Sequence, residues 1–288
     1  MRIFVTGATG FIGSAIVQEL IGARHEVIGL ARSDAAARSL AAAGARVHRG
    51  ALEDLASLER GAAESDGVIH TAFIHDFSKF EASCETDQRA INALGAALAG
   101  SGRPLVVSSG SMGLANEEAA PNASIPRKSE QTALATAAAG VRAMVIRLSP
   151  SVHGDGDHGF VPRIIAVARE KGFSSYVGDG KNRWPAVHRL DAARLYRLAI
   201  EKGTSGARFH AVADEGVPIR DIAEIIGRRL NVPVVSKSPE EAVHLFGFVG
   251  RFLAMDGPSS SRRTQEQLGW RPSERGLIAD LEQGRYFD

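Results

Sequence analysis

The chain has 288 residues, of which 44% are hydrophobic, and a net charge of +1 from 34 basic and 33 acidic side chains. This composition is typical of a globular protein long enough for one large core or two unequal lobes. The near-zero charge gives no electrostatic basis for binding nucleic acid or a membrane surface. No segment approaches the ~18 consecutive apolar residues of a membrane span.

A single cysteine, Cys84, excludes an intrachain disulfide and is typical of a reducing compartment. The glycine pattern that begins at Gly7 leaves no room for a secretory leader. We therefore expect a cytoplasmic protein.

Short apolar runs alternate with alanine-rich helical segments over the first 150 residues. The runs that read as strands are residues 3–7, 25–32, 45–50, 67–73, 103–109 and 142–149. The clearest helices between them are expected over residues 13–23, 85–100 and 128–139. Strands separated by helices imply crossover connections and a parallel sheet. The sequence therefore predicts an α/β fold of the Rossmann type, with a doubly wound parallel sheet.

After about residue 150 this alternation becomes irregular, with glycine- and aspartate-rich loops between the helical segments. Further helices are expected over residues 190–203, 218–230 and 238–255, and a further strand over residues 207–214. For the apolar segment 238–255, packing against the sheet domain is favoured over a role as the wall of a substrate cavity. We expect a dinucleotide-binding domain over residues 1–150, with returning segments near 185–215. A smaller C-terminal substrate lobe would comprise residues 151–184 and 216–288.

Three glycines follow the first predicted strand in TGATGFIG, with the spacing GxxGxxG. Glycine lets the chain turn sharply, lets backbone N–H groups approach a pyrophosphate, and lets the next helix pack close to the strand. The helix then directs its positive N-terminal end at the phosphates. A loop in this context favours a dinucleotide site over a glycine-rich turn without a ligand. The residues assigned to the site are Gly7, Thr9, Gly10, Phe11, Ile12 and Gly13.

The end of the second predicted strand indicates which dinucleotide binds. NAD-specific sites carry an acid here, which accepts hydrogen bonds from the ribose 2′-hydroxyl. This chain has Arg32, followed by Ser33 and, further along, Arg38. Because a guanidinium matches a phosphate with two parallel hydrogen bonds, NADP(H) is favoured as the cofactor over NAD(H). The alternative is a solvated Arg32, with Asp34 contacting the ribose.

The chain resembles the extended short-chain dehydrogenase/reductase superfamily, the group of NAD(P)-dependent epimerases and dehydratases, over nearly its whole length. TGATGFIG is similar to the family's TGxxGxxG, GALEDLASL (50–58) to GDLxDxxSL, and DGVIHTAF (66–73) to DxVIHxAA. INALGAALAG (91–100) is similar to xNVxGTxNLLEA, and VVSSGSMG (106–113) to the strand with the catalytic serine. VIRLSPSVHGDGD (145–157) resembles LRxxNVYGPGD, and GDGKNRWPAVHRLDAARL (178–195) resembles GDGxQxRxFVHVDDLAxA.

This resemblance implies roles for individual residues. Asn92 corresponds to the family's structural and catalytic asparagine, and Ser109 or Ser111 would polarise a substrate carbonyl. Further cofactor contacts are implied at Leu52, Thr71, Ala72, Phe73, Ser108, Pro150 and Ser151.

One part of the family pattern is missing. The family's general acid is a tyrosine in a YxxxK pair, whose lysine lies on the same helical face, lowers the phenol pKa and holds the ribose. None of the three tyrosines here has a lysine four residues later, and the expected segment reads SIPRKSEQTALA (124–135). Arg127 lies at the right place in that segment, and His153 occupies the tyrosine position of the VYG-like segment. Each also has a purely structural alternative, as a charge beside a helix start and as a packed loop histidine.

Substrate is expected across the carboxyl ends of the strands. Candidate lining residues are His75, Phe77, Phe160 and Trp184, and Arg183 falls near where sugar-nucleotide enzymes of the family hold a diphosphate. The histidines show no metal-ligand spacing, so no metal is expected.

The sequence favours an NADP(H)-dependent oxidoreductase that transfers hydride to or from a small carbonyl-type molecule. The alternatives are a nucleotide-sugar epimerase or dehydratase, and an NADP(H)-binding sensor or regulator without turnover. The expected partner is a small-molecule substrate, with a homodimer left open as the assembly.

Overall fold

The computed structural model describes residues 1–122 and 124–288, except for the side chains of Phe77 and Phe248. The expectation for Phe77 therefore lies outside the described side chains. The central element is a seven-stranded sheet in the order β10-β6-β5-β4-β1-β2-β3, and every neighbouring pair in it is parallel. Its strands are β1 (Arg2–Thr6), β2 (Glu26–Ala31), β3 (Arg46–Arg49), β4 (Gly67–His70), β5 (Pro104–Gly110), β6 (Arg142–Leu148) and β10 (Arg208–Ala211). The predicted doubly wound parallel sheet is confirmed.

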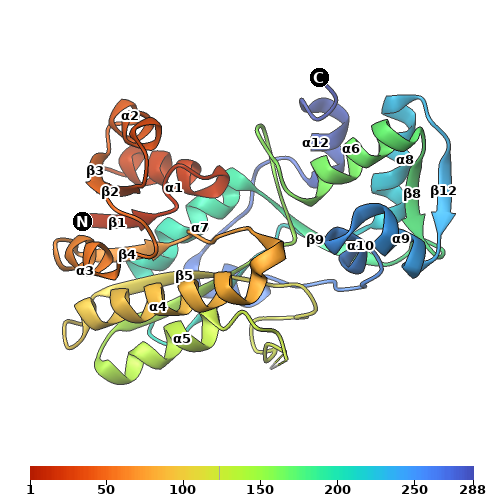
Figure 1. The fold of residues 1–288 in the computed structure, drawn as a ribbon. Coiled ribbons are helices and arrows are strands. Elements are labelled where there is room, and N and C mark those ends of the chain that lie inside the picture. The colour runs from red at the N-terminus through yellow and green to blue at the C-terminus, as the bar shows by residue number, and fades with distance from the viewer. Residues whose placement is uncertain (123) are drawn as a thin grey trace.

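Helices cover both faces of this sheet (Figure 1). Ile3 and Val5 of β1 pack into one core and Phe4 into the other, because successive side chains of a strand point to opposite faces. Burial on both faces explains why the strands read as continuous apolar runs. One face carries α1 (Phe11–Gly22), α2 (Asp34–Ala42) and α7 (Arg189–Lys202), and the other carries α3 (Leu55–Ala63), α4 (Phe80–Leu98) and α5 (Ser129–Ala135). Short 3₁₀ turns, η1 (Phe77–Lys79) and η2 (Thr136–Ala139), precede α4 and follow α5.

A second, smaller group of elements lies beside the large sheet (Figure 1). Its strands form a three-stranded sheet, β11-β9-β7, and a two-stranded sheet, β12-β8. They are β7 (Ser151–His153), β8 (Ser174–Val177), β9 (Arg183–His188), β11 (Asp214–Pro218) and β12 (Val234–Lys237). The helices are α6 (Phe160–Lys171), α8 (Ile219–Leu230), α9 (Pro239–Phe246), α10 (Phe248–Leu253) and α12 (Leu277–Gln283). The remaining helix, α11 (Arg262–Leu268), packs instead against α7 and β10 of the large-sheet layer. No helix among the described residues is both long enough and apolar enough to cross a bilayer.

Two segments differ from the sequence-based expectation in ways that affect the site. The strand expected over 67–73 ends at His70, so residues 71–73 form a loop at the carboxyl edge of the sheet. The segment 238–255 is a helix pair, α9 and α10, that bends at Gly247 with φ +59°. Phe246 and Leu253 of this pair lie in a core with α6, α8 and α12, so it packs within the smaller group and not against the large sheet as expected.

Candidate functional site

The glycine loop joins β1 to α1 at the carboxyl edge of the large sheet. Gly7 adopts φ +69°, and a Cβ on Gly13 would lie 1.9 Å from the carbonyl oxygen of Gly7. Gly10 is the N-cap of α1, no side chain caps this helix end, and its first turn holds no acidic residue. The first-turn N–H groups are therefore free to donate to an anion at the positive end of the helix. This geometry fits a dinucleotide pyrophosphate, with Thr9 exposed at the crest of the loop.

Tight packing of this loop makes Gly13 the most sensitive of its glycines. We expect Gly13→Ala to lower the free energy of unfolding by about 1–3 kcal/mol, because the new methyl group meets main chain that cannot yield. Weaker binding of a dinucleotide should accompany the loss. Gly22→Ala is the matched control in the same helix, since nothing lies within 4 Å of its added Cβ. Urea unfolding and calorimetric titration of both variants check this, and a Gly13→Ala protein with unchanged stability and binding would contradict it.

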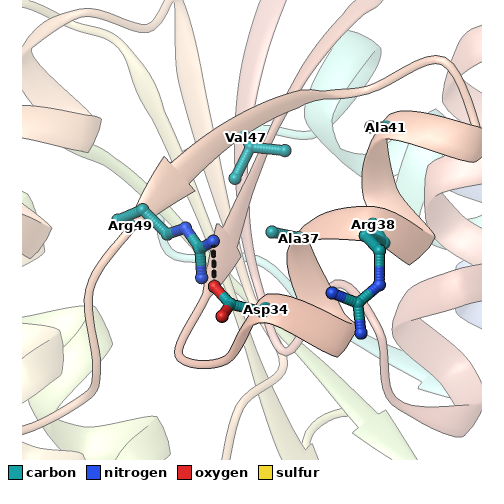
Figure 2. A pocket seen from close by; sticks show the side chains of 6 residues that line it. All are labelled: Asp34, Ala37, Arg38, Ala41, Val47 and Arg49. Carbon is teal, nitrogen blue, oxygen red and sulfur yellow. Dashed lines mark hydrogen bonds and ion pairs between the residues drawn. The ribbon is translucent and has the colours of Figure 1, made fainter.

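The end of β2 presents a positive charge. Arg32 is exposed and, within the described part of the chain, makes no hydrogen bond or ion pair. The Ser33 hydroxyl caps α2 by accepting from the N–H of Ala36 over 3.2 Å. Asp34, the alternative partner for a ribose, pairs with Arg49 of β3 over 2.5 Å (Figure 2).

This ion pair lies in a surface hollow of about 420 Å³ between α2 and β3, and Arg38 lies further along α2 (Figure 2). Arg49 neutralises Asp34, whereas Arg32 and Arg38 form no ion pair with any described residue and keep their positive charge available at this edge.

The loop of residues 71–73 is hydrogen-bonded to the end of β1. The Thr71 hydroxyl donates to the carbonyl oxygen of Thr6 over 2.8 Å, and the N–H of Ala72 donates to the Thr6 hydroxyl over 3.4 Å. A Cβ on Gly7 would lie 2.6 Å from the Thr71 hydroxyl, so the two loops are in direct contact. Leu52 is buried in the neighbouring loop after β3.

The serines at the end of β5 differ in what their side chains face. The Ser108 hydroxyl is buried, donates to the carbonyl oxygen of His70 over 2.9 Å and bonds the Tyr196 hydroxyl over 2.6 Å. Ser111 is fully buried, and its hydroxyl has no partner among the described residues. Ser109 is half-buried and points to the opposite face from Ser108. Of the three, only Ser109 offers a partly open hydroxyl at the strand end.

The structure brings Arg127 to this strand end. Its Nε donates to the Ser129 hydroxyl over 2.9 Å, and its Nη2 donates to the carbonyl oxygen of Ser108 over 3.4 Å. The guanidinium carbon lies 4.2 Å from the centre of the Phe73 ring, a cation–π contact. The ring of His75 lies 5.3 Å from that of Phe73. Partial desolvation and the positive charge of Arg127 lower the pKa of His75, an exposed residue, below its ordinary value.

Comparison with known proteins identifies the family. Residues 3–212 match the NAD dependent epimerase/dehydratase family. The chain belongs to this family. An uncharacterised protein of Schizosaccharomyces pombe is 52% identical over 296 residues, which cover 100% of both chains.

Two more distant proteins of known activity are also similar. The 4-hydroxy-2-methyl-3-oxo-4-farnesyl-3,4-dihydroquinoline-1-oxide ketoreductase of Stigmatella aurantiaca is 26% identical, over 88% of this chain and 80% of its own. The structure of the dTDP-glucose 4,6-dehydratase DesIV from Streptomyces venezuelae with NAD bound superposes with a TM-score of 0.78, at 21% identity. It covers 98% of this chain and 95% of DesIV. The resemblance to extended epimerases and dehydratases is confirmed, and the family places this chain among proteins of the NAD(P)-dependent oxidoreductase or epimerase kind.

The other residues that the family pattern suggests for the active site differ in burial and in their partners. Asn92 is exposed on α4. His153 is fully buried, and its Nδ1 lies 2.9 Å from Oδ2 of Asp280, while its Nε2 has no partner among the described residues. Ser151, two residues before it on β7, is also buried with an unpartnered hydroxyl, and Pro150 before it is half-buried.

The expected substrate residues of the smaller group are engaged in packing. Trp184 is fully buried and donates from its indole N–H to the carbonyl oxygen of Phe252 over 3.0 Å. The half-buried Phe160 packs on it with ring centres 5.7 Å apart. Arg183 donates to both carboxylate oxygens of Asp256 over 3.0 and 2.9 Å, which occupies its guanidinium.

One buried acid of the site was not found from the sequence. Asp87 is 2% exposed and accepts from the Ser129 hydroxyl over 2.5 Å. Its Oδ1 lies 3.1 Å from Nε2 of His70. The available signal was its position on the apolar face of α4, where Cys84 and Ile91 also lie, because an acid on such a face is buried only when it is paired.

Proposed function

We propose that this protein is an NADP(H)-dependent oxidoreductase that transfers hydride to or from the carbonyl carbon of a small molecule. The observation that carries the proposal is the Arg127 guanidinium, which lies over Phe73 and donates to the carbonyl oxygen of Ser108, one residue before the partly open Ser109. Arg127 belongs to the segment where the family has its tyrosine. Two groups that stabilise an oxyanion thus lie at the end of β5.

The glycine loop and the charged end of β2 would hold the cofactor. The first-turn N–H groups of α1 suit the pyrophosphate, and Arg32 with Arg38 suits a 2′-phosphate. When bound, NADPH supplies the hydride that reduces the carbonyl carbon.

The chain's own residues would stabilise and protonate the oxygen of that carbonyl. Ser109 donates a hydrogen bond to it, and Arg127 stabilises the negative charge that develops there. A guanidinium does not give up its proton at neutral pH. We assign the proton that completes the alcohol to His75, whose ring lies 5.3 Å from that of Phe73, the ring on which Arg127 stacks. The lowered pKa of His75 makes its imidazolium a stronger acid, and less of it is present at neutral pH.

The remaining alternatives have less support. A nucleotide-sugar epimerase would need a cation for the diphosphate, and the guanidinium of Arg183 is already engaged by Asp256. A sensor without turnover would need no oxyanion site, so Arg127 and Ser109 favour an enzyme.

Purified protein incubated with NADPH and a panel of aldehydes, ketones and quinones tests the proposal. We expect NADPH to be consumed with at least one panel member, with one alcohol formed per NADPH. Interconversion of a nucleotide sugar without net change in the cofactor would overturn the proposal in favour of an epimerase. Cofactor binding without turnover of any panel member or nucleotide sugar would overturn it in favour of a sensor.

A further inference from the structure

A continuous series of buried polar groups connects the cofactor-side loop to Arg127. The Thr6 hydroxyl at the end of β1 lies 2.8 Å from Nδ1 of His70, and Nε2 of His70 lies 3.1 Å from Asp87. On the other side of Asp87, the Ser129 hydroxyl bridges to Nε of Arg127. Thr6, His70, Asp87 and Ser129 are each at most 2% exposed.

One assignment of protons gives every hydrogen bond of this series a donor and an acceptor. The N–H of Ala72 donates to the Thr6 hydroxyl, which donates to Nδ1 of His70, and Nε2–H of His70 then donates to Asp87. From the other end, Nε–H of Arg127 donates to the Ser129 hydroxyl, which donates to Asp87. An ionised carboxylate accepts from both sides at once with no proton of its own to place, and these charge-assisted hydrogen bonds are the stronger ones.

The charge state of Asp87 agrees with this arrangement. Burial alone would raise the pKa of the Asp87 carboxyl, but the hydrogen bond and charge of His70 and the charge of Arg127 hold it below its ordinary value. Within the described residues no carboxylate lies within ion-pair distance of Arg127. The Ser129 hydroxyl, which accepts from Arg127 and donates to Asp87, is therefore the hydrogen-bonded link between the guanidinium and the carboxylate.

We propose that Asp87 is a positioning residue that, through Ser129, fixes the guanidinium of Arg127 at the end of β5, and that His70 ties this anchor to the cofactor-binding loops. The inference rests on the proposed function for the catalytic role of Arg127, but the positioning itself is independent of that role. Residues 71–73 touch both ends of the series, because Ala72 donates to Thr6 and the ring of Phe73 lies under Arg127. The series therefore fixes the position of the guanidinium relative to this loop.

Two substitutions cut the series at different points. Ser129→Ala removes the bridge to Arg127 and leaves the bond between Asp87 and His70 in place. Asp87→Asn keeps the size of the side chain but replaces one carboxylate oxygen with an NH₂ group. That group is a donor, so it cannot accept the hydrogen bond from whichever of His70 and Ser129 it faces. Ser83→Ala is the matched control, because Ser83 is a buried residue of α4, one turn before Asp87, and is not part of the series.

Nuclear magnetic resonance of the arginine Nε–H groups tests the proposal without a substrate. The Arg127 signal is assigned by its absence in Arg127→Lys. In the wild-type protein we expect it to exchange with water at least about 10-fold more slowly than that of the exposed Arg38, and to lose this protection in Ser129→Ala and Asp87→Asn. Ser83→Ala should keep it. Retained protection in Ser129→Ala and Asp87→Asn, or equal loss in Ser83→Ala, would overturn the proposal.

Turnover gives a second readout. With the substrate found in the carbonyl panel, Ser129→Ala should lower kcat by about 10-fold while the NADPH affinity stays unchanged, because a charge-assisted hydrogen bond is lost away from the cofactor. An equal loss of NADPH affinity would instead indicate general loosening and overturn the positioning role. If the wild-type protein reduces no carbonyl, the proposed function fails, and the exchange measurement still decides whether Asp87 positions Arg127.

Discussion

Replacing Arg127 with methionine should lower kcat for carbonyl reduction by about 10²- to 10³-fold, the usual loss when a group that stabilises an oxyanion is removed. The cause is the loss of positive charge next to the oxygen on which negative charge develops. The affinity for NADPH should change little, since Arg127 contacts Phe73, Ser108 and Ser129 and none of the residues of the glycine loop among those described. Steady-state kinetics with the substrate from the carbonyl panel, beside calorimetric titration of NADPH, gives both quantities.

Arg127→Lys is the control that separates charge from shape. An ammonium keeps the positive charge but loses the planar donor fork and the stacking on Phe73, so its kcat should lie between those of the wild-type and methionine proteins. Urea unfolding must show that both variants are folded. A folded Arg127→Met protein with the wild-type kcat would remove Arg127 from the mechanism and leave Ser109 as the group that polarises the carbonyl.

Replacing Arg32 with aspartate should lower the preference for NADPH over NADH by about 100-fold, measured as the ratio of the two dissociation constants. Arg32 is exposed at the end of β2 and makes no hydrogen bond or ion pair with the described residues, so its charge is available to a 2′-phosphate. The aspartate both removes the charge-assisted hydrogen bonds and repels the phosphate, while it can accept from the ribose hydroxyls of NADH.

Arg60→Asp, an equal change of charge at an exposed position of α3, is the matched control and should leave the ratio unchanged. A second variant, Asp34→Asn, tests whether the acid beside Arg32 contributes. Because Asp34 is already paired with Arg49, its loss should change the ratio far less than the loss of Arg32. An unchanged ratio in Arg32→Asp, or a large change in Asp34→Asn, would contradict the assignment of Arg32.

Local sequence patterns were sufficient for the sheet and the glycine loop. The alternation of strands and helices predicts a parallel sheet, and the crossing of β1 and α1 at Gly7 and Gly13 follows from glycine's lack of a side chain. The position of Arg127 also follows from the spacing of the family's motifs. These features depend on residues close together in the chain or on one ordered series of motifs.

Contacts between residues far apart in the sequence determine the features of the site that local patterns did not predict. Arg183 is paired with Asp256 and His153 with Asp280, and no local spacing indicates either partner. The two contacts engage side chains that the family pattern suggests for substrate and catalysis. Asp87 shows the opposite case, because it looks like an ordinary helix acid until the fold brings His70 and Ser129 to it. The packing of the segment 238–255 likewise depends on α6 and α8, which the sequence does not place beside it.

Isothermal titration calorimetry of the wild-type chain with NADPH and with NADH tests the central claim most directly. The free first turn of α1 and the unpaired Arg32 predict saturable binding of both nucleotides, with NADPH bound at least about 10-fold more tightly. Tighter binding of NADH, or no heat with either nucleotide, would contradict the account.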